Sequence, residues 1–207
     1  AEKAMMSAAA RLTDERKKQA SKLCREISRA LEDLSFMEVR FDMVFDELTE
    51  CTANGIDDCY FVISTNVGEK MRPLYEVASG GELSRIMLAI KSCMASEDNI
   101  GTLVFDEIDV GISGRAAQAV AEKMAVISRS HQVISITHLP QIAAMADSHY
   151  LIEKSAEGGK TVTHIERLGD EESILEIARL LGGVTITDAV MSNAREMKQM
   201  AEKSKNY

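Results

Sequence analysis

The sequence has few cysteines, no long apolar run and no excess of basic charge. Its four cysteines form no C-x-x-C pair and have no histidine at ligand spacing, so we expect reduced thiols in a cytosolic protein, with a disulfide or zinc site as the alternative. No apolar run approaches the roughly 20 residues of a membrane span, and no signal-peptide pattern is present, so we expect no membrane partner. The net charge is −9 and the pI is near 5.0. Any contact with nucleic acid is therefore expected to be local or made by other parts of a longer protein.

Glycine and proline are absent from residues 2–35, which favours one long helix. Five apolar residues share the three- and four-residue spacing of a heptad seam: Ala20, Leu23, Ile27, Ala30 and Leu34. One narrow apolar stripe predicts the end of a coiled coil over residues 1–36, and a surface helix lying on the domain is the alternative. Because the chain enters directly into this helix without an initial methionine, we expect it to be a piece of a longer protein.

The pattern changes at residue 37, and we expect residues 37–207 to form a second domain of the α/β class. Alternation from Met37 to Phe45 predicts a half-buried strand, followed by a turn at residues 52–55 and a returning strand at residues 59–64. The later predicted elements are buried strands at 103–105 and 133–136, helices at 84–92, 115–128, 171–181 and 187–203, a short helix after Pro140, and a hairpin of 150–152 with 161–167 through Gly158-Gly159.

Two carboxylates follow the first buried strand. Asp106 and Glu107 are expected at the strand's carboxyl end, where ligands bind in open α/β sheets. Mg²⁺ favours one or two carboxylates together with water and phosphate oxygens, which fits Asp106. Glu107 is then placed to orient and deprotonate a water that attacks a γ-phosphate. His138 follows the next buried strand, where its ring can bond to the same phosphate. The alternative is an acidic loop after a core strand.

A Ser-Gly-Gly turn opens the helix predicted at residues 84–92. Its unpaired N–H groups suit a phosphate, and Gly80 and Gly81 allow close backbone approach. Ser79 offers a hydroxyl group and an N-cap, so a well-capped helix without a ligand is the alternative.

A phosphate loop of the form G-x-x-x-x-G-K-[ST] is missing. The sequence at residues 159–161 matches only its tail, because Lys154 stands where the first glycine belongs. The residues that follow alternate as in a strand, so we interpret this site as a hairpin turn. The sequence thus predicts half of an ATP-hydrolysing site.

Three separated motifs, ASGGELSR (78–85), LVFDEID (103–109) and ITHLPQIA (136–143), resemble the signature motif, Walker B strand and switch histidine of SMC-superfamily ABC-type ATPase heads. Together with EIARLLGG (176–183), they are most similar to a bacterial branch acting in DNA double-strand-break repair and recombination. The resemblance implies an α/β fold, the C-terminal lobe of an ABC/SMC-type P-loop ATPase head preceded by a coiled-coil-end helix. In that family the N-terminal lobe carries the Walker A loop.

The resemblance also implies that ATP and Mg²⁺ are sandwiched between two heads. The implied roles are γ-phosphate contacts to the opposing head's ATP by Ser79, Gly80 and Gly81, Mg²⁺ binding by Asp106, general base for Glu107, switch residue for His138, and a D-loop across the interface from Asp109 to Ser113. The D-loop departs from the SMC pattern, which usually ends in Leu-Asp where this chain has Ile112-Ser113.

The implied partners are the N-terminal lobe of the same protein, a second head in a homodimer, and DNA through the full-length assembly, in the cytoplasm and associated with the nucleoid. Without Walker A, the chain alone is expected to be inactive. Removing the other lobe should leave an apolar face of the sheet open. The alternatives are a non-catalytic interaction module of an SMC-like chromosome-maintenance protein and an ABC transporter nucleotide domain. The heptad helix argues against the transporter domain.

Overall fold

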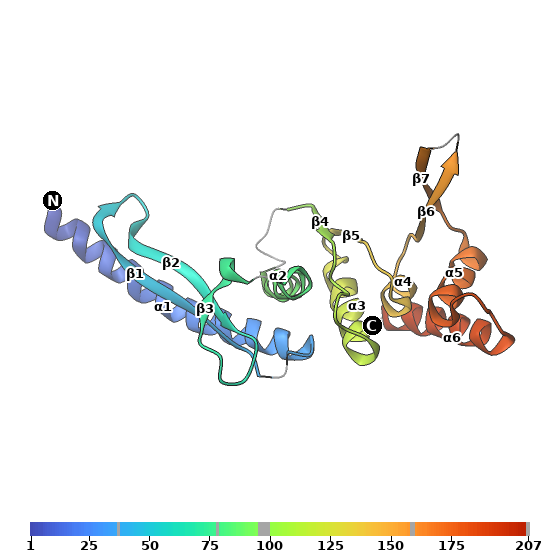
Figure 1. Ribbon diagram of the computed structural model, residues 1–207. Coiled ribbons are helices and arrows are strands. Elements are labelled where there is room, and N and C mark those ends of the chain that lie inside the picture. The colour runs from blue at the N-terminus through green and yellow to red at the C-terminus, as the bar shows by residue number, and fades with distance from the viewer. Residues whose placement is uncertain (37, 78, 95–99, 158–159, 206–207) are drawn as a thin grey trace. The chain divides into compact units, whose positions relative to one another are not determined.

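The structure is a computed structural model that describes residues 1–36, 38–77, 79–94, 100–157 and 160–205. The chain divides into two compact units, Ala1–Asn99 and Ile100–Tyr207, whose elements are labelled in Figure 1. Met37, at the start of the predicted first strand, and the predicted turn at Gly158-Gly159 lie outside the described residues, as does Ala78 of the predicted signature motif.

Unit 1 combines a long helix, a three-stranded sheet and the helix of the Ser-Gly-Gly turn. The sheet is antiparallel in the order β1-β2-β3. The elements in chain order are α1 (Glu2–Asp33), β1 (Arg40–Thr52), β2 (Gly55–Ser64), β3 (Arg72–Pro73), the 3-10 helix η1 (Leu74–Glu76) and α2 (Gly80–Met94). The long first helix is confirmed, and Figure 1 shows it running along the β1–β2 hairpin. The short β3 and η1 lie in a segment for which no helix or strand was predicted.

The predicted heptad seam of α1 is largely covered inside unit 1. Ile27 is fully buried and Leu34 is 1% exposed, and α1 contacts β1, β2 and α2. Farther toward the N-terminus, Met5 is 46% exposed and Leu12 is 40% exposed. The seam beyond Ala20 therefore contributes to the core of the unit. Pairing of α1 with a second helix, and a domain boundary between residues 36 and 37, stay predictions.

A buried carboxylate joins the first half of α1 to the far end of the hairpin. Asp57 on β2 accepts hydrogen bonds from the Thr13 hydroxyl at 2.7 Å and from Arg16 Nη1 at 2.9 Å. Its side chain is only 5% exposed. Gly55 begins β2 with a φ of +96°, a conformation that favours glycine, and a Cβ there would lie 3.2 Å from Leu12, so a side chain would also require Leu12 to shift slightly.

Unit 2 confirms the predicted α/β alternation. Its elements are β4 (Thr102–Phe105), α3 (Gly114–Ile127), β5 (Gln132–Ser135), α4 (Pro140–Ala144), β6 (Tyr150–Glu157), β7 (Lys160–Arg167), α5 (Asp170–Gly182) and α6 (Asp188–Lys205). β4 and β5 are parallel, and β6 and β7 form an antiparallel hairpin. Lys160 and Thr161 of the G-K-T sequence lie at the start of β7, so the residues that follow form a strand, as predicted.

The parallel pair β4–β5 is covered on one face only. Leu103 and Phe105 are buried, at 9% and 5% exposure. On the other face, Val104 is 65% exposed and Ile134 is 46% exposed. Both strands were predicted to be buried, and an apolar face was predicted to be open where the other lobe is absent; the exposure of Val104 and Ile134 agrees with the open face. Parallel strands normally have both faces covered, so the exposed side of β4–β5 is an apolar surface without cover in the described residues.

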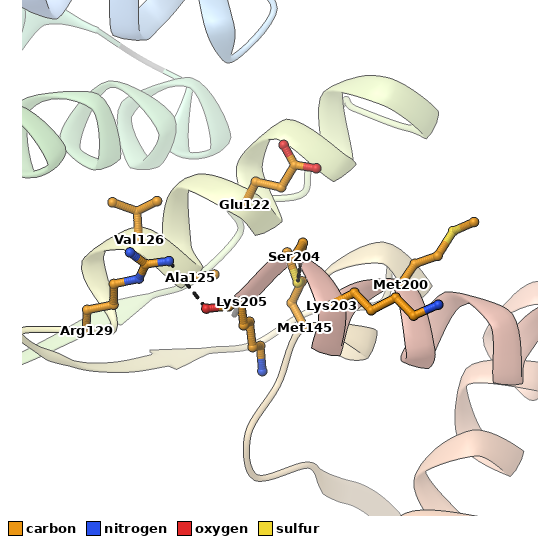
Figure 2. A pocket seen from close by; sticks show the side chains of 9 residues that line it. All are labelled: Glu122, Ala125, Val126, Arg129, Met145, Met200, Lys203, Ser204 and Lys205. Atoms are coloured by element: carbon orange, nitrogen blue, oxygen red, sulfur yellow. Dashed lines mark hydrogen bonds between the residues drawn. The ribbon is translucent and has the colours of Figure 1, made fainter. Parts of the chain in front are cut away.

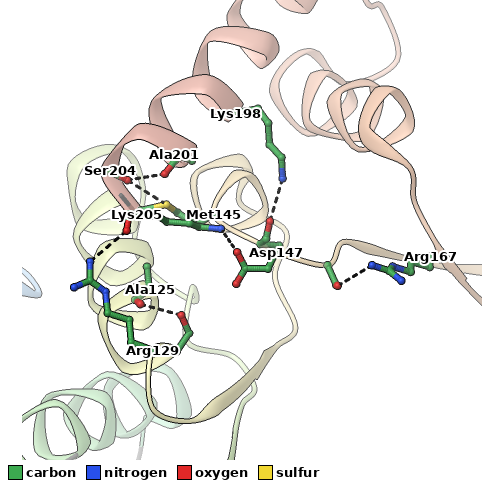
Figure 3. A network of polar contacts seen from close by, with 12 residues as sticks. Ala125, Arg129, Met145, Asp147, Arg167, Lys198, Ala201, Ser204 and Lys205 are labelled. Atoms are coloured by element: carbon green, nitrogen blue, oxygen red, sulfur yellow. Dashed lines mark hydrogen bonds and ion pairs between the residues drawn. The ribbon is translucent and has the colours of Figure 1, made fainter. Parts of the chain in front are cut away.

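Polar contacts fasten the end of α6 to its surroundings in unit 2 (Figure 3). Lys205 pairs with Asp147 at 2.6 Å, and its carbonyl oxygen accepts a hydrogen bond from Arg129 at the end of α3. Lys198 Nζ donates to the Ala146 carbonyl oxygen at 3.0 Å. These contacts hold α6 against the segment that follows α4.

Candidate active site

Asp106 and Glu107 stand at the carboxyl end of β4, as predicted, and both are exposed. Glu107 has a φ of +57°, a left-handed conformation that is uncommon for any residue with a side chain. This turn sends the next two residues inward: Ile108 is fully buried and Asp109 is 3% exposed. The Glu107 N–H donates to Asp106 Oδ1 at 2.9 Å. Non-glycine residues in this conformation cost about 1–3 kcal/mol and cluster at functional sites.

The carboxylate of Asp109 turns toward the end of β5. Its Oδ2 atom accepts hydrogen bonds from the Thr137 hydroxyl at 2.6 Å and from the His138 backbone N–H at 2.8 Å. The same oxygen lies 3.0 Å from Nδ1 of the His138 ring. The family resemblance implied a place for Asp109 only in a loop across the head–head interface, and this contact was not predicted. No local sequence pattern connects residues 28 or 29 positions apart, so only the fold shows it.

His138 lies at the same edge of the sheet as the carboxylates. The Ile136 N–H donates to the Phe105 carbonyl oxygen at 3.1 Å, which continues the pairing of β4 and β5 and aligns the segments that follow them. The His138 side chain is 70% exposed. Unit 2 therefore brings Asp106, Glu107, Asp109 and His138 to one edge.

The Ser-Gly-Gly turn lies in unit 1 and begins α2. Ser79 Oγ accepts a hydrogen bond from the Glu82 N–H at 3.3 Å, and the Ser79 carbonyl oxygen accepts one from the Leu83 N–H at 2.9 Å. Ser79 and Gly80 are exposed, whereas Gly81 is buried. The expected N-cap is thus present, and it is compatible both with a phosphate contact and with a helix that is simply capped. The contact to an opposing head's ATP stays a prediction.

Residues 109–113 form a tight turn before α3. The Val110 N–H donates to the Glu107 carbonyl oxygen at 3.0 Å, and Gly111 has a φ of +77°. Ser113 is exposed and is the N-cap residue of α3, although its side chain makes no capping hydrogen bond. The Asp109 carboxylate points into its own unit, so an interface contact by this loop would use its backbone or other side chains, such as Val110 and Ser113. That contact stays a prediction.

The carboxylates fit Mg²⁺ in only one way. Among the described residues, no group of three histidine, cysteine or acidic side chains is arranged to hold a metal ion. Mg²⁺ keeps several waters and takes one or two carboxylates when phosphate supplies the other oxygens. Asp106, an exposed carboxylate at a strand end, fits that mode, and ATP would have to provide the phosphate.

A groove of about 530 Å³ lies elsewhere in unit 2 (Figure 2). Ala125 and Val126 of α3, together with Met145 and Met200, give it an apolar lining. Among the described residues that line it, Glu122 is the only one with a carboxylate, and none is histidine or cysteine. It shares no residue with the predicted site and offers no acid–base pair, so the candidate site remains the edge of β4–β5.

The four cysteines, which all lie among the described residues, form no disulfide. Within the described part of the chain, no helix combines the length and apolar character that crossing a membrane requires.

Solved structures with this fold are SMC head domains. The Smc head domain with a coiled coil and joint from Pyrococcus yayanosii matches with a TM-score of 0.55 and 22% identity, covering 79% of this chain and 29% of that chain. The Smc head domain with an extended coiled coil from Pyrococcus furiosus matches with a TM-score of 0.53 and 24% identity, covering 80% of this chain and 39% of that chain. The fold is therefore that of part of an SMC head domain.

The sequence relatives are more specific, although no protein-family model matches the chain. It is 44% identical to the DNA repair protein RecN of Halalkalibacterium halodurans over 93% of its length and 43% identical to that of Bacillus subtilis over 95%. RecN of Haemophilus influenzae is 38% identical over 93% of the chain. The chain belongs to the RecN family. It spans only 35% to 37% of the length of these relatives.

Proposed function

We propose that the chain is the C-terminal lobe of a RecN-like, SMC-type ATPase head that acts in DNA double-strand-break repair and recombination. The observation that carries this proposal is the meeting of Asp106, Glu107 and His138 at one edge of the parallel strands. This edge is where α/β folds bind ligands. The relatives' names, DNA repair protein RecN, support the role in repair.

Each residue of the site has a distinct task. Asp106 would hold Mg²⁺, and the ion would supply positive charge that neutralises the phosphate oxygens. Glu107 accepts the proton of the water whose oxygen bonds to the γ-phosphorus, while the bond from that phosphorus to the oxygen of the departing ADP breaks. His138 donates a hydrogen bond from its ring to a γ-phosphate oxygen. The exposure of Glu107 and His138 keeps both groups accessible to such a ligand.

The site is completed by other parts of the assembly. The N-terminal lobe of the same protein supplies the Walker A loop, and the open face with Val104 and Ile134 supports a missing lobe that covers it. A second head in a homodimer receives the Ser79–Gly81 turn across the sandwiched ATP. By itself the chain is inert, and the assembled protein engages DNA in the cytoplasm, where it associates with the nucleoid.

Substitution of Glu107 by Gln in the longer protein tests the proposal. The amide cannot take the water's proton, so we expect ATP turnover to fall by roughly 100-fold or more, with ATP affinity retained. Phosphate release and nucleotide titration measure the two properties. The matched control is Glu122→Gln, which makes the same change in the groove of Figure 2 and should leave turnover unchanged.

Unchanged turnover in Glu107→Gln would remove the assigned base. If the parent protein neither binds nor hydrolyses ATP, the alternative is favoured. In that case the chain belongs to a non-catalytic interaction module and its carboxylates are structural.

A further inference from the structure

We infer that Asp109 is a positioning residue for His138: its buried carboxylate holds the proton of the ring on Nδ1 and thereby leaves Nε2 as the nitrogen that meets the phosphate. The catalytic role of this arrangement rests on the proposed function. The arrangement itself is a property of unit 2 and can be measured without ATP.

Three groups of the loop after β5 face one oxygen atom of Asp109. Asp109 Oδ2 lies 3.0 Å from His138 Nδ1, and it also accepts from the Thr137 hydroxyl and the His138 N–H. An ionised carboxylate only accepts hydrogen bonds, so the ring nitrogen that faces it has to carry a proton. The hydrogen bond made by one ring nitrogen decides the role of the other.

Asp109 and His138 differ strongly in exposure. The Asp109 side chain is 3% exposed and the His138 side chain is 70% exposed. A buried carboxylate is strongly disfavoured unless donors surround it, so its three contacts fix its position. The acid is thus the fixed member of the pair, and the exposed ring is oriented by it.

Hydrogen bonds also hold the backbone of the loop that carries His138. The Thr137 hydroxyl donates to Asp109 and also accepts a hydrogen bond from the Leu139 N–H at 3.0 Å. On the other side, the turn that contains Asp109 is closed by the bond from Val110 to Glu107. Asp109 therefore ties the turn of the proposed base to the loop of the proposed switch residue.

This arrangement gives the ring two useful forms. With Nδ1 protonated, the neutral ring presents the lone pair of Nε2. When the ring takes up a second proton, Nε2–H donates to a phosphate oxygen, and the Asp109 carboxylate balances the positive charge. Without Asp109, neither the tautomer nor the orientation of the ring is fixed.

Nitrogen-15 NMR of the histidine rings in the 207-residue chain tests the inference, with the His138 signals assigned by their loss in His138→Gln. We expect neutral His138 to be protonated on Nδ1 in the wild-type chain and to lose this preference in Asp109→Ala. The control Asp147→Ala removes an exposed carboxylate of the same unit and should leave the tautomer unchanged. A wild-type ring protonated on Nε2 overturns the inference even if Asp109→Ala fails to fold, and so does a folded Asp109→Ala chain that keeps the Nδ1–H form.

Turnover in the longer protein gives the functional readout. Asp109→Asn should lower kcat for ATP by about 10- to 100-fold, as outer partners of a functional histidine do, with little change in KM. An unchanged kcat would overturn the positioning role. If Glu107→Gln leaves turnover unchanged while the tautomer is as expected, the proposed function fails and the Asp109–His138 arrangement stands.

Discussion

Two aspartates with almost no exposed side chain, Asp57 and Asp109, join segments that are far apart in the sequence. Asp57 fixes α1 to the hairpin through Thr13 and Arg16, and Asp109 fixes the end of β5 to the turn after β4. Sequence patterns marked Asp109 by its place after the Asp-Glu pair, but they gave no reason to select Asp57. Its partners lie 41 and 44 positions away, and an acidic residue in a strand is by itself compatible with exposure.

The stability contributed by Asp57 should depend on pH. The hydrogen bond from Thr13 lowers the pKa of Asp57, burial acts in the opposite direction, and the Arg16 guanidinium lowers it further. With a pKa below the unfolded value of about 3.9, the contribution is complete above that value and disappears as the pH falls through the folded pKa. Asp57→Asn should therefore cost about 1–3 kcal/mol at pH 7 and less at pH 3.

Urea unfolding of the chain at both pH values measures this difference. Asp58→Asn is the matched control, because Asp58 is exposed on the same strand and should change stability little. A wild-type unfolding midpoint for Asp57→Asn at pH 7 would contradict the role of this carboxylate.

At the scale of elements, the predictions that the structure confirms rest on local sequence patterns. The features that these patterns do not show depend on residues outside the element. The absence of glycine and proline predicted α1, and period-two alternation predicted β1, because each signal lies within the element itself. The open face of β4–β5 was predicted only from the resemblance, which implied an absent lobe. The strand sequences alone do not show it, because Val104 and Leu103 are equally apolar although only Leu103 is buried. Cover depends on which segments are present, which a strand's composition does not record.

Alanine substitutions along α1 should distinguish the part of the helix that packs in the core from its exposed N-terminal end. Ile27 is fully buried, so Ile27→Ala should destabilise the chain by about 2–5 kcal/mol through lost contacts and a cavity. Met5→Ala removes a side chain that is 46% exposed and should change stability by about 0.5 kcal/mol or less. Thermal or urea unfolding compares the two. Equal effects would show that the seam is not packed inside unit 1.

At the scale of the whole molecule, the proposed catalytic side chains lie on this chain, and the groups that hold ATP are proposed to lie elsewhere in the longer protein. Asp106, Glu107 and His138 meet at one sheet edge, yet the sequence supplies no phosphate loop. The order of the three motifs was enough to identify the SMC-type head, and the relatives and fold confirm it. The chain's share of its relatives' length, about 35%, leaves room for the proposed remainder of the site.

ATP turnover by the 207-residue chain and by the longer protein, measured under identical conditions with Mg²⁺, tests the central claim most directly. We expect no turnover above background from the chain alone, because no Walker A loop positions the phosphates. The longer protein should turn over ATP, and Glu107→Gln should abolish that turnover. A chain that hydrolyses ATP alone at the rate of the longer protein would contradict the claim that it holds half of a composite site.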